Sequence, residues 1–206
     1  MTADRYELAP ERLRRWLERW AEAHGGMAET GGDGAVVRFT ARDGAVLECE
    51  PPFGPVEGDL LAHVGRERTV GVLLVRLGGH AAGVFAGTRL IDSKVGSRPV
   101  HGRNRKGGSS SGRFARRREG QARIALQAAA DVAARVLGVP AEAGALDAVV
   151  LGGDRGALAA VLEDARLAAL RPLAAERVLD VPDPRLKVLR ATPAAFLTTV
   201  VRPLEP

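Results

Sequence analysis

Residues 69–98 carry the strongest strand signals in the chain, and they most limit what it can fold into. The segment opens with the apolar run TVGVLLVRLGG and continues with HAAGVFAGTRLIDSKVGSR, which is partly apolar and partly alternating. Gly78 and Gly79 separate the two runs, a pattern typical of a turn between neighbouring strands. Long apolar runs of this kind belong to buried strands. The sequence therefore predicts a pair of antiparallel strands within a sheet.

Helical and strand patterns alternate after this segment. Residues 113–137 have the spacing of a long helix, which Gly138 and Pro140 are expected to end. LDAVVLGGDRGALAAVLEDARL predicts a buried strand, a tight turn and a helix capped by Asp154, and ERVLDV predicts another short strand. The order strand, strand, helix, strand, helix, strand indicates an α/β fold, with a mixed sheet flanked by helices. The residues expected to line the buried face of the long helix are Phe114, Ala125, Ala128, Ala129, Val132 and Val136.

The ends of the chain carry simpler signals. Residues 10–24 have the i, i+3, i+4 apolar spacing of an amphipathic helix, and the Asp-Gly pair at Asp43 predicts a β-hairpin. The C-terminal segment DPRLKVLRATPAAFLTTVV reads as helical from Pro184, with Asp183 as its cap and an interruption at Pro193. We expect two domains, a helix and hairpin unit over 1–66 and the α/β domain over 67–206.

Positive charge is concentrated in one segment. The chain as a whole has a formal charge of +5, but residues 94–123 hold ten Lys and Arg and one acid, a charge of +9, which leaves −4 for the rest. The Gly- and Ser-rich middle of this segment predicts a flexible loop over 102–112. A basic site on a mildly acidic protein indicates a polyanionic partner. The alternative is a solvated basic face with no partner.

Four arginines fall at the start of the predicted long helix, one at 113 and three at 116–118. The positive end of the helix macrodipole makes this placement unfavourable, by about a few tenths of a kcal/mol per charge. Guanidinium groups beside the free N–H groups of a helix start form a phosphate-binding surface. We expect a nucleic-acid contact that depends strongly on salt and weakly on sequence. The basic residues assigned to it are Arg103, Arg105, Lys106, Arg113, Arg116, Arg117 and Arg118.

The stretch KGGSSSGRFARRREGQ resembles the loop and helix of the actinobacterial Vms-like release factors. These are relatives of the middle, peptidyl-tRNA-hydrolysing domain of eukaryotic and archaeal release factors. Their pattern is Gly-Gly-x-Ser-Gln, then Arg-Phe-x-Arg-Arg-Arg and a nearby Gln. The resemblance spans most of the chain and implies an RNase H-like fold. The matching positions are Gly107, Gly108, Ser110, Arg113, Phe114, Arg116, Arg117, Arg118 and Gln121.

One position departs from this pattern, because Ser111 stands where the family carries its catalytic Gln. In the family that Gln enters the peptidyl-transferase centre and positions water against the ester that joins peptide to tRNA. Gly107 and Gly108 are expected to shape the loop tip, where a backbone N–H can stabilise the oxyanion. Ser110 and Ser111 are the candidate water-positioning groups. Gln121 lies about two helical turns beyond Arg113, so we assign it a structural or RNA-contacting role.

The resemblance implies a peptidyl-tRNA hydrolase that acts on stalled ribosomes in rescue or translation quality control. Its partners would be ribosomal RNA and peptidyl-tRNA, with no DNA, membrane, metal or organic cofactor. The single cysteine, Cys49, and an N-terminus that contains acids and no continuous apolar stretch suit a cytoplasmic protein. The Ser at 111 leaves three interpretations open: a divergent active hydrolase, a ribosome- or tRNA-binding protein of the same fold without catalysis, or a chain whose loop tip has been substituted.

Other types of site receive less support. A serine hydrolase built on the Ser tract would need His101 as its base, but no acid is positioned to orient it. A nuclease would use Asp92, Asp147 and Asp154 as metal ligands. LGGDRGAL lacks the Gly-Lys-Ser/Thr ending of a phosphate loop. The four histidines have no metal-ligand spacing, and Cys49 reads as a buried small hydrophobe.

Overall fold

The computed structural model describes residues 4–76, 78–98 and 111–204, with the backbone alone for 111–118. The chain forms two compact units: an N-terminal unit, Met1–Glu67 with Pro193–Pro206, and a central unit, Arg68–Thr192. The predicted second domain, 67–206, is therefore wrong at its C-terminal end. The last segment joins the N-terminal unit because its strand pairs there with two other strands.

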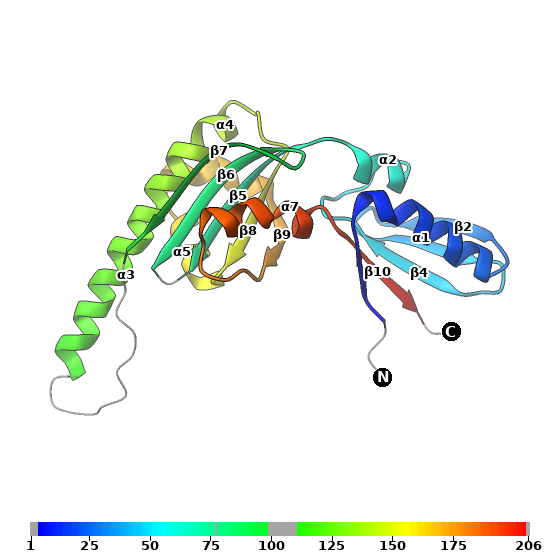
Figure 1. Ribbon diagram of the computed structural model, residues 1–206, viewed down its shortest axis with the longest axis horizontal. Helices are drawn as coiled ribbons and strands as arrows, with labels where there is room; N and C mark the ends of the chain where they lie inside the picture. Colours follow the sequence, from blue (N-terminus) through cyan, green and yellow to red (C-terminus); the bar gives the residue numbers. More distant parts are fainter. Residues whose placement is uncertain (1–3, 77, 99–110, 205–206) are drawn as a thin grey trace. The chain divides into compact units, whose positions relative to one another are not determined.

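The central unit is built on a five-stranded mixed sheet, shown in green to orange in Figure 1. The strand order is β7-β6-β5-β8-β9, and β6 alone runs antiparallel to the other four. This order and these directions are those of the RNase H-like fold, so the predicted α/β, RNase H-like mixed sheet is confirmed. The strands are β5 (Thr69–Arg76), β6 (Gly79–Ala86), β7 (Arg89–Ser97), β8 (Ala148–Gly153) and β9 (Ala174–Leu179).

The predicted strand pair is present as β5 and β6, but the second apolar run contains two strands rather than one. Gly87 has a φ of 56° and makes the turn that separates β6 from β7. Glycine easily adopts the left-handed conformation, so the chain can reverse its direction here within two residues. β5 is the central strand, and all of its residues except the first and the last are buried.

The long helix is α3, Ser111–Ala133, and helical structure continues after it, past the Gly138 and Pro140 that were expected to end it. A π-helical segment, Ala134–Gly138, follows, and then α4, Val139–Glu142, with Pro140 in its first turn. Proline lacks the N–H that would bond four residues back and crowds that carbonyl, and the π-helical turn before it loosens the helix at this point. The helical structure ends later, before Gly144, whose φ is 66°.

One stripe of α3 packs against the sheet and supplies much of the core. The core also takes in α5, Arg155–Leu162, and the 3₁₀ segment Ala165–Leu173. Asp154 caps α5 as predicted, accepting a hydrogen bond from the N–H of Ala157 at 2.7 Å. Residues Glu119–Glu142 contain an 18-residue window with a mean hydropathy of 1.3, apolar enough for a membrane span, and 39% of that window is buried inside the protein. Packing against the sheet accounts for their apolar character.

An ion-pair network ties α3 to the 3₁₀ segment. The Arg166 guanidinium donates to Asp164 at 2.7 Å and to Asp131 of α3 at 2.8 Å. Hydrogen bonds from Arg166 lower the pKa of Asp164 to about 2 and also lower the pKa of Asp131. The network is a surface contact that adds to the core packing of the C-terminal part of α3.

The opposite face of the sheet is covered by α6, Leu186–Ala191, whose Leu189 lies against Gly83 of β6. Strand alternation explains the two faces, since Ala82 and Val84 belong to the core under α3. The predicted C-terminal helix is only partly correct. The interruption at Pro193 is present, since it separates α6 from α7, Pro193–Phe196. Arg185 rather than Asp183 is the N-cap residue of α6, and the β-branched run at the end forms the strand β10, Thr199–Leu204.

The N-terminal unit has its own sheet, in the order β1-β10-β4-β3-β2. The predicted amphipathic helix is α1, with Leu13, Leu17 and Trp20 buried, and the predicted hairpin at Asp43 joins β3 to β4. Cys49 is fully buried, and burial raises the pKa of its thiol to about 12. The elements are β1 (Tyr6–Leu8), α1 (Pro10–Ala23), β2 (Met27–Gly32), β3 (Val37–Ala41), β4 (Val46–Glu50), α2 (Leu60–Gly65), α7 and β10.

Candidate functional site

The predicted site divides between residues that the structure describes and residues that it does not. Helix α3 begins at Ser111, so the predicted loop 102–112 extends two residues into the helix. The family's catalytic position is therefore the first residue of α3, directly ahead of the arginines. The predicted residues that lie outside the described part of the chain are Arg103, Arg105, Lys106, Gly107, Gly108 and Ser110.

Helix α3 is held at its C-terminal half and extends beyond the sheet at its N-terminal half, past the ends of β6 and β7 (Figure 1). Its 23 residues span about 34 Å at the usual rise. Ala122, Ala125 and Leu126 are the first residues that face the sheet, and Ala129, Ala130 and Ala133 follow them into the core. About three turns of helix therefore precede the packed part.

The opposite side of α3 carries a second stripe, which we call the outer stripe. Its members follow one another at spacings of three and four residues, so they share one helix face. Arg123 and Ile124 belong to it and are exposed, Ile124 to 59%. Sequence reasoning missed its C-terminal part, although the helical spacing from Arg116 and Arg117 could have indicated it. The outer stripe consists of Arg113, Arg116, Arg117, Gly120, Arg123 and Ile124.

Two predicted residues lie off this stripe. Arg118 falls in phase with the sheet-facing residues Ala122 and Ala125, in the part of α3 that extends beyond the sheet. Gln121 is half-buried at the side of the helix. The first turn of α3 contains no acid, so nothing there offsets the positive end of the macrodipole. The start of α3 therefore combines N–H groups that have no partner within the helix with four arginine positions, an arrangement suited to phosphate.

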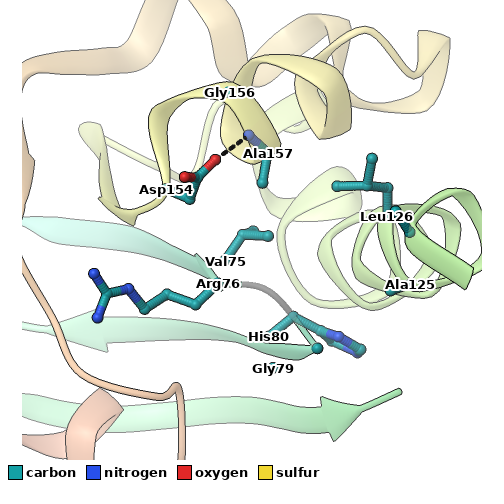
Figure 2. A pocket seen from close by; sticks show the side chains of 11 residues that line it. Val75, Arg76, Gly79, His80, Ala125, Leu126, Asp154, Gly156 and Ala157 are labelled. Carbon is teal, nitrogen blue, oxygen red and sulfur yellow. Dashed lines mark hydrogen bonds between the residues drawn. The ribbon is translucent and has the colours of Figure 1, made fainter. Parts of the chain in front are cut away.

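A cavity of about 220 Å³ lies beyond the carboxyl ends of β5 and β8 (Figure 2). At this point the connections that follow the two strands lead to opposite edges of the central sheet. Bound molecules commonly occupy this place in α/β sheets. Its walls come from α3, from the start of α5 and from the β5–β6 turn. His80 is 4% exposed there, and burial, followed by the charge of Arg98, lowers its pKa. The lining residues are Val75, Arg76, Gly78, Gly79, His80, Ala122, Ala125, Leu126, Asp154, Gly156 and Ala157.

The carboxylates that a nuclease would need do not gather around this cavity. Asp154 caps α5, Asp147 accepts the backbone N–H of Thr69 at 2.7 Å, and Asp92 accepts that of Ser93 at 2.7 Å. Among the described residues no three acids, histidines or cysteines come together as metal ligands. The nuclease interpretation therefore lacks its metal site in this part of the molecule. Each acid instead has a local structural partner.

The histidines and the cysteine that were considered as site residues are described next to their partners or lie outside the described residues. His24 pairs with Asp43 at 2.8 Å, and the His63 ring bonds the Phe53 carbonyl, so both are packed residues. His101, the base of the hypothetical serine hydrolase, lies outside the described residues. Cys49 is buried, as predicted, and its raised pKa disfavours the nucleophilic thiolate.

Gly153, at the end of β8, lies against Val75, which lines the cavity, and we expect Gly153→Ala to be strongly destabilising. Its φ is 106°, and a methyl group would overlap the carbonyl oxygen of Val75. Strain and overlap together should lower the free energy of unfolding by about 3 kcal/mol, measured by urea denaturation. Gly144→Ala is the control, because its φ of 66° is strained but the space around it is open. We expect it to cost about 1 kcal/mol, and equal losses would contradict this account.

The central unit has an RNase H-like sheet, and its helix α3 begins with four arginine positions, as the resemblance to release factors predicts. The comparison with family models makes this specific. The chain belongs to the Actinobacteria/chloroflexi VLRF1 release factor family, acVLRF1, whose model matches residues 68–202. The match begins where the central unit begins and ends within β10. The family predicted from the loop and helix is confirmed, and it gives the protein a role in translation at the ribosome.

Solved structures show more distant similarity. The crystal structure of an archaeal translation termination factor, aRF1, is 16% identical, with a TM-score of 0.47, covering 88% of this chain and 68% of that one. A structure described as an archaeal protein is 17% identical, with a TM-score of 0.41, covering 74% of this chain and 47% of that one. No curated protein matches the sequence.

Proposed function

We propose that this protein is a peptidyl-tRNA hydrolase that releases nascent chains from stalled ribosomes in the cytoplasm. The observation that carries the proposal is the position of the family's loop and helix. The Gly-Gly-x-Ser segment stands directly before α3, and α3 extends past the sheet with four arginine positions in its first turns. A helix that extends this far beyond the sheet would allow the segment before it to reach a recessed ester.

The chemistry is an ester hydrolysis. Water adds to the ester carbonyl, and the bond between the carbonyl carbon and the tRNA 3′ oxygen breaks. One water proton passes to that oxygen and the other is released to solvent. The products are a peptide carboxylate and a tRNA with a free 3′ hydroxyl. Gly107 and Gly108 would allow close approach of the backbone, and a backbone N–H would stabilise the oxyanion. Ser110 and Ser111 would hold the attacking water.

The arginines would act by binding and positioning. Arginine forms paired hydrogen bonds with phosphate oxygens, which fix orientation as well as adding affinity. Arg113, Arg116, Arg117 and Arg118 would hold ribosomal RNA or the tRNA acceptor end, together with Arg103, Arg105 and Lys106. Such contacts would hold the ester at a fixed distance from the attacking water, so that the two no longer have to meet by diffusion.

A second candidate is supported by one observation, the Ser at position 111. A hydroxyl on one carbon reaches less far than the family's amide on two, so water would be held less well. A ribosome- or tRNA-binding protein without hydrolysis is the function that this difference favours. The two candidates share the binding surface and differ only in chemistry.

Peptide release distinguishes the two candidates. Ribosomes stalled with labelled peptidyl-tRNA are incubated with rising concentrations of the protein, and binding and free peptide are measured on the same samples. The hydrolase predicts a release rate that rises with occupancy and reaches a plateau above the rate without protein. Full occupancy with no release above that background would favour the binding protein and contradict the hydrolase.

A further inference from the structure

Gly120 lies on the outer stripe of α3, at a place where no described residue requires a glycine. It is helical, with a negative φ, and an added methyl group would meet no described atom within 4 Å. Glycine is the poorest helix former after proline, so an alanine here would hold the helix better. A glycine without a steric or conformational reason within the protein indicates close approach by another molecule.

Ile124 stands one helical turn further along the same stripe. Its side chain is 59% exposed, although α3 has a complete apolar stripe on the opposite side. A single exposed isoleucine is ordinary by itself. Here Ile124 lies four residues from Gly120 and directly after the exposed Arg123. One face of the helix therefore combines a position without a side chain, a cation and an exposed apolar side chain.

Charge decides which kind of partner this face fits. Residues 94–123 carry ten cations and one acid, and three arginine positions continue the outer stripe toward Ser111. An RNA strand offers phosphates to the arginines and sugar and base faces to the isoleucine. The missing side chain at Gly120 lets such a backbone lie against the helix.

We propose that the outer stripe is an RNA-binding face and that Gly120, Arg123 and Ile124 set how closely an RNA backbone approaches α3. The contact therefore extends about 16 Å along the helix, well beyond the arginine cluster. The proposal rests on the proposed function for the source of the RNA, which is the ribosome or its bound tRNA. It adds three residues that hold the helix against that RNA.

The sharpest test uses Gly120, because stability and binding should change in opposite directions. Gly120→Ala should raise the melting temperature and weaken binding to purified large ribosomal subunits about threefold, since even a methyl group holds the RNA backbone off the helix. Gly120→Gln should weaken binding at least tenfold with no loss of stability. Arg123→Ala should reduce the salt slope of binding by about one phosphate contact. Arg190→Ala, an exposed arginine on α6, is the matched control and should leave binding unchanged.

The identity of the partner is tested at position 124. A photo-crosslinking residue placed there, irradiated in the complex with large subunits, should attach to RNA. Attachment to ribosomal protein alone would overturn the choice of RNA. Natural affinity in both Gly120 variants would overturn the role of the stripe while leaving the proposed function intact. Failure of the natural chain to bind ribosomes would overturn both.

Discussion

Replacing Arg116, Arg117 and Arg118 together with alanine should lower ribosome affinity at least 100-fold at physiological salt. Each arginine is expected to make a charge-assisted contact with phosphate that contributes about 1 kcal/mol or more. The salt dependence should fall as well, with the slope of log K against log salt reduced by about two to three. The helix itself should survive, because alanine is the strongest helix former. Co-sedimentation across a salt series measures both quantities.

A matched control is available on the other face of the central sheet. Arg185, Lys187 and Arg190 are exposed at α6, and their replacement by alanine removes the same charge from the same unit. If binding depends on the start of α3, this variant should retain nearly all of its affinity. An equal loss in both triple variants would show that net charge, rather than the placement of the arginines, produces the interaction.

Ser111→Gln should raise the rate of peptide release about 100-fold at saturating protein. A well-positioned group that orders the attacking water contributes on this scale, and the amide restores the reach that a serine hydroxyl lacks. Affinity for the ribosome should hardly change, because no cation is added or removed. Single-turnover release measured above the binding midpoint therefore isolates the chemical step.

Ser111→Asn separates reach from chemistry. Asparagine carries the same amide on a side chain shorter by one carbon, so its release rate should stay close to that of the serine protein. An asparagine variant as fast as the glutamine variant would show that the amide alone matters. A glutamine variant no faster than the natural chain would contradict the assignment of position 111 to water positioning.

Much of the fold was predictable because its signals are local. The apolar run of β5, the Asp154 cap and the Asp43 hairpin each depend on residues close in sequence, and each is present as expected. The errors arose where distant partners decide. β10 reads as helical by itself, yet pairing with β4 and β1 makes it a strand. Pro140 is a helix breaker in an α-helix, and a π-helical turn accommodates it here.

The candidate site was only partly predictable, because motif and geometry carry different information. The spacing of glycines and arginines indicated the family, which the match over 68–202 confirms. The sequence did not show where the helix begins or which residues continue the arginine face. Gly120 and Ile124 became visible once the packed stripe of α3 fixed the opposite side. The roles of the loop residues remain predictions.

The state of the tRNA after reaction tests the central claim most directly. Stalled ribosomes carrying peptidyl-tRNA labelled in both the peptide and the 3′ end of the tRNA are treated with the natural protein at saturation, and both products are resolved. Ester hydrolysis predicts free peptide together with tRNA whose 3′ end is intact and can be aminoacylated again. Peptide that remains attached to tRNA, or tRNA shortened at its 3′ end, would contradict the hydrolase.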